Sequence, residues 1–503
     1  MLLIQRFAEQ IKGMLSCFDR VVITGTLTDI GHARSATSWA KRHKLKIFDF
    51  PEVAKRWREA IRENAERLAA EAGVKIEFVR RSSFRKEARI KAIIKERGNH
   101  PGLVHVLSAM ESCPAFKPWH DKCSGQTYLK PDTGRCLHYY FYFIDEELGL
   151  CYLRVPTWAP YRLQFYFNGH EWLARRLKRE GVPCQLLDNA FVDIGDWQRA
   201  QEIADSFEVK RLHRKLNEYA ARFCPAAASF EGGYHFSIMQ LEYATDIAFR
   251  DREALAPLYE ELVRTATSAV KAPDVASFLG RRLNPRYDGE LGSDFHTRIE
   301  GMRIKHYMGK AALKMYDKHG QVLRIETVAN EVSFFKHHRE VEHRDGSSSV
   351  KLAPVKKTIY SLNVLAKLMG AANRRYLAFI SALDDSSEGD RRLSQIARPA
   401  YDKARSYRGI NFFERRDLTL IYAIARGEYR IRGFQVRDLR QHLPDLNGSQ
   451  ISRLVKRLRM HRLIKKIGHS YRYHLTRLGE RVIAAGLKLR QFSIIPALAG
   501  NTG

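Results

Sequence analysis

The segment "KMYDKHGQVLRIET" (residues 314–327) alternates apolar and ionisable residues on both sides of one glycine. Alternation with a period of two is typical of β-strands, and two such runs joined by a glycine-containing turn predict a hairpin. A three-residue loop over residues 318–320, with Gly320 in the left-handed conformation, divides the side chains into two faces. The apolar face holds Leu313, Met315, Leu323 and Ile325. The polar face, which we expect to be an exposed working surface, holds Lys314, Tyr316, Arg324 and Glu326.

The composition is that of a globular protein. Of the 503 residues, 45% are hydrophobic and 28% are charged, and this length allows about two to four domains. No run approaches the roughly 18 apolar residues of a membrane span. The N-terminal "MLLIQRFAEQIKGML" is interrupted by charges, so it predicts an amphipathic helix rather than a signal peptide. We therefore expect an α+β multidomain protein in the cytoplasm, with no membrane partner.

The charge of the chain is strongly one-sided. Lys and Arg number 86 against 56 Asp and Glu, which gives a formal net charge of +30. The repulsion among so many positive charges destabilises a compact fold unless a polyanion neutralises them. Nucleic acid is therefore the expected partner, with DNA favoured and RNA as the alternative.

The order of helix and strand patterns predicts five segments. Residues 1–115 alternate short strands with helices, which indicates an α/β domain with a small parallel sheet. Residues 116–345 are expected to form a central α+β body with an aromatic sheet, a buried helix at 234–251 and the basic hairpin. A helical connector (346–400), a winged helix (401–490) and a tail (491–503) follow.

The C-terminal segment is the most basic part of the chain. Residues 401–503 hold 22 Lys and Arg against 7 Asp and Glu. Three helical patterns are followed by two short strands and another helix, an order typical of a winged helix-turn-helix. The third helix, "NGSQISRLVKRLRMHRLI", carries one apolar stripe formed by Ile451, Leu454, Leu458 and Leu463.

This segment, and above all "RLIKKIGHSYRYHLTRLGERV" (residues 462–482), resembles a MarR-type winged helix. In that family the third helix enters the major groove and the wing touches phosphate or the minor groove. The resemblance implies that the third helix faces DNA with Gln450, Arg453, Lys456 and Arg457. It also implies a wing that contacts DNA with Lys465, Lys466, His469 and Arg472. The alternative is a winged helix used for protein contacts.

A second resemblance spans nearly the whole chain. The segments "FDRVVITGTL", "RCLHYYFYF", "NGHEWLARRL", "RIKH" and "KMYDKHGQVLRIET", in this order, resemble a recurrent family of bacterial proteins that end in a MarR-like helix. This resemblance implies one shared architecture and no particular activity.

Carboxylates near strand ends suggest a metal site. Asp19 begins the first predicted strand, Glu111 follows the strand at 102–110, and Asp188 precedes a further apolar run. If these side chains converge, they suit Mg²⁺ or Mn²⁺ for phosphoryl transfer; the alternative is helix caps and ion pairs. Glu242 and Asp246, at i and i+4 of the predicted helix, form a further metal or ion-pair candidate.

An aromatic and basic sheet offers a second kind of site. Alternation in "HYYFYF" places Tyr140 and Tyr142 on one face, and the adjoining strands add Arg154 and Arg162. Single-stranded bases stack on such faces while arginines hold the phosphates. The alternative is a sheet whose aromatic residues are core.

The opening hairpin also resembles the "YDK…LRxE" hairpin of plasmid and phage rolling-circle replication initiators, which nick one strand with a metal-assisted tyrosine. The resemblance implies Tyr316 as nucleophile, with Glu326 and Asp317 as metal ligands, although the His-x-His motif of those enzymes is absent. The alternatives are phosphate contact by Lys314 and Arg324, or a structural salt-bridged hairpin.

The seven cysteines lack the C-x-x-C spacing, which favours scattered reduced thiols. The alternative is a zinc site drawn from Cys113, Cys123 and Cys136 with His120 or His138.

Together these patterns predict a nucleic-acid-binding protein of mobile-element or replication type that acts on DNA. Cleavage of phosphodiesters with Mg²⁺ or Mn²⁺, as a nuclease or nickase, is an attached hypothesis. The alternatives are an RNA-binding protein of a ribonucleoprotein and a non-catalytic MarR-like transcription regulator. The patterns predict no oligomeric state.

Overall fold

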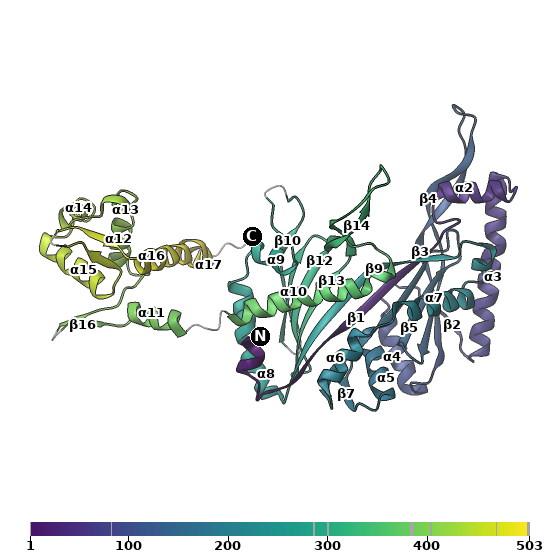
Figure 1. The fold of residues 1–503 in the computed structure, drawn as a ribbon, viewed down its shortest axis with the longest axis horizontal. Coiled ribbons are helices and arrows are strands. Elements are labelled where there is room, and N and C mark those ends of the chain that lie inside the picture. The colour runs from purple at the N-terminus through teal and green to yellow at the C-terminus, as the bar shows by residue number, and fades with distance from the viewer. Residues whose placement is uncertain are drawn as a thin grey trace. The chain divides into compact units, whose positions relative to one another are not determined.

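The computed structural model describes residues 2–81, 83–284, 287–298, 301–382, 387–402, 405–468 and 470–499. They belong to two compact units, Met1–Ala382 and Leu383–Gly503. The first unit is a mixed α+β structure built on one large sheet (Figure 1).

Eleven strands of the described residues form this sheet. In spatial order they are β10 (Leu291–Arg298), β11 (Gly301–Met308), β12 (Ala311–Lys318), β13 (Val322–Ala329), β9 (Tyr234–Phe249), β1 (Ile11–Leu27), β6 (Leu163–Asn168), β5 (Gly149–Pro156), β4 (Thr127–Asp145), β3 (Gly102–His120) and β2 (Ile76–Phe78). Neighbouring strands are antiparallel except β2 and β3. The predicted parallel layer is therefore limited to one short pair.

Strand β1 joins the two halves of the sheet. It pairs with β9 from Ile11 to Leu27 and with β6 from Arg20 to Gly25. Beyond the end of β6, the Gln201 side chain of α6 (Trp197–Asp205) takes the place of a strand and exchanges hydrogen bonds of 2.8 and 3.0 Å with the Ser16 backbone. One sheet therefore runs through both the predicted α/β domain and the predicted body.

The predicted domain boundaries differ from the structure for the same reason. The boundary at residue 115 falls inside β3, which pairs with β4 along its whole length. The boundary at residue 345 falls in the turn between β14 (Lys336–Glu342) and β15 (Ser348–Pro354). Long-range strand pairing is not visible in a local pattern of hydrophobic residues.

Two predicted helices are wrong. Residues 1–15 form only the short α1 (Leu2–Arg6), and β1 begins at Ile11. Residues 234–251 form β9, not a helix. An apolar run of this kind does not distinguish a buried strand from a buried helix, and tertiary pairing decides between them.

One face of the sheet is apolar and covered by helices. The helices α2 (Ala33–Arg42), α3 (Phe50–Glu71) and α7 (Val209–Phe223) contribute side chains to the core over β3–β6, whereas α8 (Arg252–Ser268), α9 (Ala272–Phe278) and α10 (Leu362–Ala382) contribute to the core over β9–β13. Figure 1 shows α10 lying across β13 and β9. The apolar residues predicted for the hairpin, Leu313, Met315, Leu323 and Ile325, are buried in this core.

The opposite face is polar, and strand register shows this directly. Tyr140, Arg154, Gln164, Thr24 and Ser237 are consecutive partners across β4, β5, β6, β1 and β9. Directly paired residues point to the same side of a sheet, so these five side chains form one row. We call this side the polar face. It is partly covered by α4 (Lys86–Arg97) over β3, and by β7 (Cys184–Leu187) and β8 (Ala190–Ile194) over β9 and β13.

The second unit contains mostly helices. Its elements are α11 (Ser387–Ala397), β16 (Ala400–Asp402), β17 (Arg405–Tyr407), α12 (Arg415–Ile424), α13 (Glu428–Arg432), α14 (Val436–Arg440), α15 (Gly448–Met460), β18 (Ile464–Lys466), β19 (Tyr473–Leu475), α16 (Arg477–Leu489) and α17 (Ile495–Leu498). Ile451, Leu458 and Leu463 of the predicted stripe are buried in its core, and Leu454 packs against it. A π-helical turn joins α16 to α17, so the helical run passes the predicted start of the tail at residue 491.

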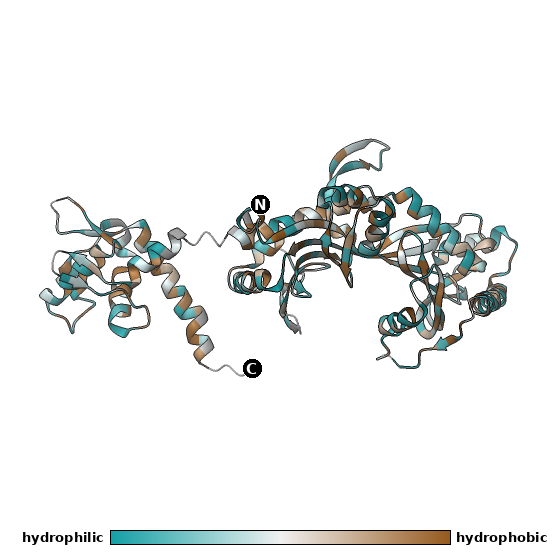
Figure 2. Cartoon of the chain, turned by 90° about the horizontal axis from the view of Figure 1, so that it is seen from below, coloured by the Kyte–Doolittle hydropathy of each residue, from teal (hydrophilic) through white to brown (hydrophobic). Residues whose placement is uncertain are grey.

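Among the described residues, no helix is both long and apolar enough to cross a membrane. Figure 2 shows hydrophilic and hydrophobic positions mixed along the helices in view.

The hydrogen bonds of Asn373 on α10 predict a stability effect. Its Nδ2 donates to the Tyr243 carbonyl (3.0 Å) and to Thr245 Oγ1 (3.1 Å), and its Oδ1 accepts from Thr327 (2.6 Å). Asn373→Leu removes these three buried hydrogen bonds, while Thr245 keeps its bond to Ser16 and Thr327 its bond to the Met369 carbonyl. The substitution should lower the free energy of unfolding by about 1–3 kcal/mol. Urea unfolding followed by circular dichroism measures the change. Asn217→Leu, at an exposed position of α7, is the matched control, and an equal effect of both variants would contradict the prediction.

Candidate functional site

The hairpin β12–β13 separates its side chains as predicted, with one change. Lys314 pairs with Glu326, Met315 with Ile325, and Tyr316 with Arg324. The loop is residues 319–321, one position later than predicted, because His319 and Gly320 both take positive φ (56° and 70°). Because the loop moves by one residue on both strands, each residue keeps its predicted face although its partner on the other strand changes.

The polar side of this hairpin is buried, which corrects the expectation of an exposed surface. Arg324 is 0% exposed, Glu326 1% and Tyr316 8%. The cover is the β7–β8 hairpin, whose Ala190 and Val192 pack against Val322 and Ala248. In this structure the Arg324 guanidinium is therefore out of reach of a phosphate.

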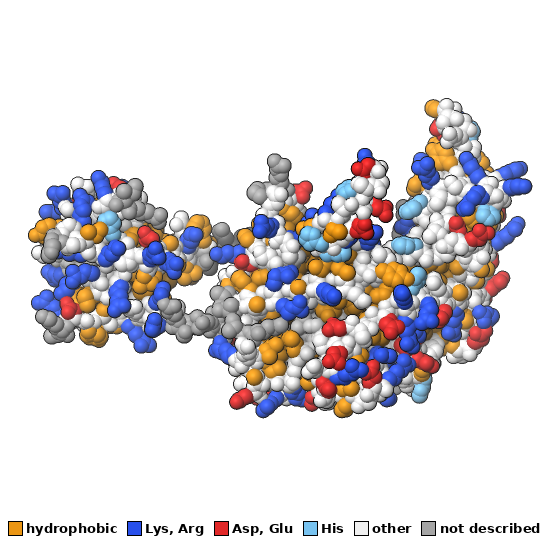
Figure 3. Space-filling model, in the orientation of Figure 1, with side chains coloured by type: hydrophobic (Ala, Val, Ile, Leu, Met, Phe, Trp, Pro, Cys, Tyr) orange, Lys and Arg blue, Asp and Glu red, His pale blue; other side chains and the backbone are white. Residues whose placement is uncertain are grey.

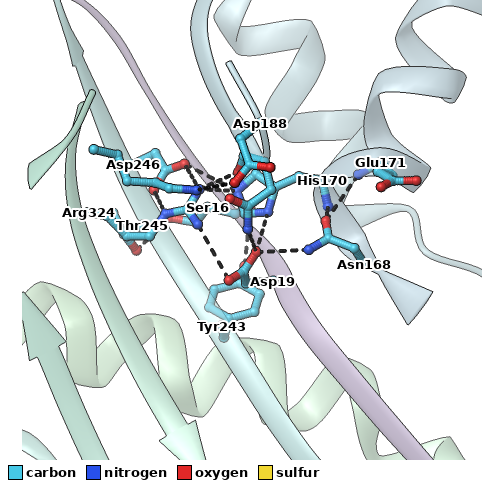
Figure 4. Close-up of polar contacts among 12 residues, drawn as sticks. Ser16, Asp19, Asn168, His170, Glu171, Asp188, Tyr243, Thr245, Asp246 and Arg324 are labelled. Carbon is cyan, nitrogen blue, oxygen red and sulfur yellow. Dashed lines mark hydrogen bonds and ion pairs between the residues drawn. The ribbon is translucent and has the colours of Figure 1, made fainter. Parts of the chain in front are cut away.

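Arg324 is the centre of a network of buried charges on the polar face (Figure 4). Its Nε and Nη2 both donate to the Asp246 carboxylate at 2.6 Å, and Nη2 also donates to the Asn189 carbonyl at 2.6 Å. Its Nη1 lies 3.4 Å from Asp19 Oδ2. A buried guanidinium with two carboxylates keeps its charge: burial would lower its pKa, but Asp246 and Asp19 raise it well above the usual value.

His170 lies between the same two carboxylates. Asn168 caps α5 (Gly169–Arg179) and accepts a hydrogen bond from the His170 backbone N–H at 2.8 Å, which places this ring at the start of the helix. His170 Nδ1 lies 3.0 Å from Asp19, and Nε2 lies 3.1 Å from Asp246. Burial would lower the pKa of His170, but Cys17 and the hydrogen bonds to Asp19 and Asp246 raise it well above 6.5. His170 Nε2 also lies 2.9 Å from Arg324 Nη2, and it could accept a hydrogen bond from this group only if the ring were neutral. We assign the charged ring, because a carboxylate lies beside each of its two nitrogens.

Asp19 occupies an irregularity of β1. The pairing of β1 with β9 shifts between Phe18 and Arg20, and such bulges re-aim a side chain. Asp19 Oδ1 accepts from Asn168 Nδ2 (3.1 Å) and Asn189 Nδ2 (2.5 Å). Burial would raise its pKa, but Arg324 and His170 hold it well below 3.8, so Asp19 is a carboxylate.

Three carboxylates converge beside this network. Ligand oxygens of Asp19, Glu242 and Glu326 lie within 4.8 Å of one another. Lys314 Nζ donates to Glu326 Oε2 at 2.8 Å and to Glu242 at 3.3 Å. Burial, with the nearby Asp19 charge, raises the pKa of Glu326 to about 8.

The donor chemistry of this cluster suits either a proton or a hard cation. Protonated Glu326 donates to Asp19; otherwise its Oε1 is buried without a hydrogen-bond partner among the described residues. Oxygen ligands are those that Mg²⁺ and Mn²⁺ prefer. Because Lys314 bonds two of the three carboxylates, a cation would have to compete with this ammonium group.

Tyr316 faces this cluster as a neutral phenol. Burial, followed by the Glu326 carboxyl, raises its pKa well above 10, which does not favour an activated nucleophile. Asp317 accepts from the Gly320 N–H at 2.9 Å, a bond within the turn.

The predicted metal set of Asp19, Glu111 and Asp188 does not come together. Glu111 accepts from the Tyr140 hydroxyl (2.6 Å) and pairs with Lys86 and Arg154, over β3–β5. Asp188 is half-exposed and pairs with Lys91 (2.7 Å) and Lys318 (3.6 Å). The ends of predicted strands did not identify the ligands, because β6, β5 and β4 separate β1, which carries Asp19, from β3, which carries Glu111.

Sequence reasoning missed His170, Asn168 and Asn189 as members of the site. It named Glu242 and Asp246 as one pair, and the structure divides them between the carboxylate cluster and Arg324. Both residues are on the polar face, because positions i and i+4 share a face in a strand as well as in a helix.

The predicted stacking platform is covered. Tyr140 and Tyr142 are buried under α4, and Lys86 Nζ lies 3.4 Å from the centroid of the Tyr140 ring. Arg154 and Arg162 line open hollows on the same face.

The predicted zinc ligands do not converge either. Cys136 Sγ lies 3.8 Å from His138 Nδ1, and Cys113 is close to Cys136. Cys123 is exposed in the loop between β3 and β4, and His120 bonds Thr127. Within the described residues, the cysteines belong to no group of three converging ligands.

The predicted DNA-facing residues of α15 divide into two groups. Gln450 and Arg453 are exposed at its start. Arg457 is buried: Nη1 and Nη2 donate to Asp417 at 2.7 and 2.6 Å, which corrects its predicted role in facing DNA. Lys456 is half-exposed and lies 3.1 Å from Asp402.

The residues predicted for the wing are on or next to the β18–β19 hairpin. Lys465 and Lys466 are exposed, and Arg472 donates to the Arg432 carbonyl at 3.0 Å. His469 lies outside the described residues.

The raised pKa of Glu326 predicts a pH dependence of stability. Between the usual 4.5 and about 8 the folded protein holds one proton more than the unfolded chain. The stability that this proton provides is complete below 4.5 and is lost as the pH rises through about 8. In this window the free energy of unfolding should fall by about 1.4 kcal/mol per pH unit from this group, and Glu326→Gln should remove that slope. Urea unfolding at a series of pH values checks it. Glu146→Gln, at an exposed position, should keep the wild-type slope; a wild-type slope in Glu326→Gln would contradict the assignment.

Comparisons with known proteins leave the identity of the chain open. No protein-family model matches it, and no curated protein matches it. Among solved structures, the crystal structure of the di-domain ARO/CYC BexL from the BE-7585A biosynthetic pathway is similar over 55% of this chain and 97% of its own, at 5% sequence identity and a TM-score of 0.12. At that score the likeness carries no argument.

Proposed function

We propose that the protein binds DNA through residues 401–490, acting as a MarR-like winged helix-turn-helix in a protein of mobile-element or replication type. In this proposal α15 is the recognition helix and the β18–β19 hairpin is the wing. The observation that carries it is the exposure of Arg453, Lys465 and Lys466 on these two elements.

The charge of this segment supports a polyanionic partner. Residues 401–503 hold 22 basic and 7 acidic residues. Figure 3 shows Lys and Arg side chains over the visible face of residues 387–499, with few acidic ones. Contacts of Lys and Arg with phosphate supply most of the non-specific affinity for DNA.

The contacts that hold α15 in the second unit support its proposed role as a rigid recognition helix. Asn447 and Gln450 cap its start with reciprocal hydrogen bonds of 2.8 and 2.9 Å. The buried Arg457–Asp417 pair joins it to α12. Arg457 thus orients the helix instead of contacting DNA, and base reading falls to Gln450 and Arg453, since the N-terminal part of a recognition helix approaches the base edges.

The rival functions differ in ligand. An RNA-binding protein of a ribonucleoprotein would prefer a structured RNA to duplex DNA, whereas a non-catalytic regulator would bind duplex DNA without using the polar face of the body. The body, Met1–Ala382, is far larger than DNA binding by residues 401–490 requires, which favours the mobile-element or replication type.

Removal of the three exposed cations should weaken duplex binding. In the full chain, the combined variant Arg453→Gln, Lys465→Gln, Lys466→Gln should lower affinity for a mixed-sequence duplex. The slope of log K against log salt should become shallower by about 0.9 for each phosphate that is no longer neutralised. Fluorescence anisotropy over a salt series measures both quantities.

Arg415→Gln, at an exposed position at the start of α12, is the matched control and should leave binding near wild type. An absence of duplex binding at low salt in the wild-type protein would refute the proposed function. Tighter binding to a structured RNA would favour the ribonucleoprotein alternative.

A second candidate function is metal-dependent phosphodiester cleavage. Two observations favour it: oxygens of Asp19, Glu242 and Glu326 lie within 4.8 Å of one another, and Glu326 Oε1, when this group is ionised, has no hydrogen-bond partner among the described residues. Mg²⁺ or Mn²⁺ held there would supply Lewis-acid stabilisation of the phosphate. The chain's own part would be to present Asp19, Glu242 and Glu326 as ligands, with Glu326 giving up its proton and Lys314 moving aside.

Manganese binding tests this candidate separately from cleavage. Electron paramagnetic resonance of free Mn²⁺ should show binding to the wild-type protein, weaker binding to Glu242→Gln and tighter binding to Lys314→Met, which removes the competing ammonium group. Labelled single-stranded, duplex and hairpin DNA report cleavage. Glu260→Gln, at an exposed position of α8, is the control. No Mn²⁺ binding, or unchanged DNA in all three forms, would exclude this activity.

A further inference from the structure

The polar face carries three hollows in a line. The first, of about 550 Å³, lies between α4 and the strands β4–β6 and is lined by Tyr152, Arg154 and Gln164. The second, of about 260 Å³, is lined by His138, Arg154 and Arg162. The third, of about 730 Å³, lies at the ends of β1 and β9 and reaches Lys357.

These hollows are parts of one groove. The first and second share Arg154, and the second and third share Thr24, Arg162 and Met239. The strand register agrees with this, since Arg154, Gln164 and Thr24 are consecutive partners across β5, β6 and β1. We call the combined feature the polar-face groove.

The lining of the groove is cationic. Its Lys and Arg residues number six against two Glu, and the six are Arg85, Lys86, Lys91, Arg154, Arg162 and Lys357. Four of them also pair with carboxylates: Lys86 and Arg154 with Glu111, Lys91 with Asp188, and Lys357 with Glu331. Cationic clefts concentrate anions by focusing the field of their charges. Because these cations are distributed along a groove rather than gathered at a point, they fit an extended polyanion better than a single phosphate.

The two central arginines are only partly satisfied by the protein. Arg154 Nη1 bonds Glu111 at 3.3 Å, and Arg162 Nη2 bonds the Gly31 carbonyl at 3.2 Å. The Nε atom of each is buried without a hydrogen-bond partner among the described residues. These Nε atoms are out of reach of the groove, so a phosphate would be met by the terminal Nη groups; the Arg154 side chain is 27% exposed.

The groove also has a few apolar contacts for bases. Met239 is 50% exposed and lines the second and third hollows, and Trp158 lines the second. Tyr140 and Tyr142 are covered by α4, so stacking on their faces is not available. Recognition by phosphate contacts with little base stacking predicts low sequence preference.

We propose that the polar-face groove binds single-stranded nucleic acid along its phosphate backbone. This inference deepens the proposed function and rests on it: residues 401–490 bind duplex DNA, and the groove binds one strand. Arg154 and Arg162 hold phosphates at the centre, and Lys357 does so at the end over β9.

The test uses the full chain with fluorescein-labelled thymidine oligonucleotide, the matched uridine oligonucleotide and a mixed-sequence duplex. Arg154→Gln combined with Arg162→Gln should weaken single-strand binding about tenfold per arginine and reduce its salt slope by about 0.7 per contact. Duplex binding should stay unchanged.

Lys357→Gln is a second variant whose result does not depend on a buried arginine, because the Lys357 side chain is 55% exposed. This variant should also weaken single-strand binding. Arg214→Gln, at an exposed position on α7 over the apolar face, is the matched control.

The outcomes separate this inference from the proposed function. Weaker single-strand binding with intact duplex binding supports the groove, and the tighter of the thymidine and uridine probes identifies DNA or RNA as its ligand. Unchanged single-strand binding in both the double variant and Lys357→Gln overturns the groove proposal. Loss of single-strand binding in the variant of residues 453, 465 and 466 also overturns it, because the single strand would then bind to residues 401–490. Wild-type protein that binds duplex but no single strand overturns the groove alone; wild-type protein that binds neither overturns both proposals.

Discussion

A fully buried guanidinium, that of Arg324, constrains the arrangement of the body. Removing such a charge from water costs several kcal/mol, and the cost is offset only when carboxylates and other acceptors surround it. Its partners come from elements far apart in the chain: Asp246 from β9, Asp19 from β1, and the Asn189 carbonyl beside β8. The position of each of these elements is therefore set by charge pairing as well as by apolar packing. A small displacement of β1 or β8 would leave a buried charge unpaired, which is far more costly than a local defect in apolar packing.

The same constraint explains why the polar face differs from the apolar one. Arg324 and His170 need two carboxylates, and the third and fourth, Glu242 and Glu326, are then too close to be ionised together without compensation. The structure compensates with Lys314 and with a proton on Glu326. An apolar helix cannot cover charges at this density. The cover is instead the β7–β8 hairpin and the start of α5, which offer the Asn189 carbonyl and the side chains of Asn189 and Asn168 as hydrogen-bond partners. Further along the face the described residues provide no such cover, and the groove is open there.

The part of the structure that sequence could predict is the part set by local periodicity. The hairpin at residues 312–328 sorts into its two faces because a strand alternates every residue, and the buried stripe of α15 follows the helical period. Asp19 and Glu326 were each predicted as site residues, but their convergence with Glu242 depends on β9 pairing with both β1 and β13. Because residues 234–251 fit a buried helix as well as a buried strand, that pairing was not foreseeable. The prediction for Arg457 was wrong for a related reason: its partner Asp417 lies 40 residues earlier, and helical spacing alone cannot show that a basic residue is held by a buried acid.

The distribution of the net charge gives the proposals a common basis. Half of the +30 lies in residues 401–503, and the buried network contributes little to the rest, because its cations face a similar number of carboxylates. The remaining excess must therefore lie on the surface of the body, and the groove, with six cations and two acids, holds part of it. A repressor needs one duplex-binding surface. The two proposals together give the protein a second surface, for a single strand, on a separate compact unit, which would be useful where duplex and single strand occur together. Opened replication origins and the ends of mobile elements offer such DNA, and for this reason the combination of the two surfaces, more than either alone, supports the mobile-element or replication type.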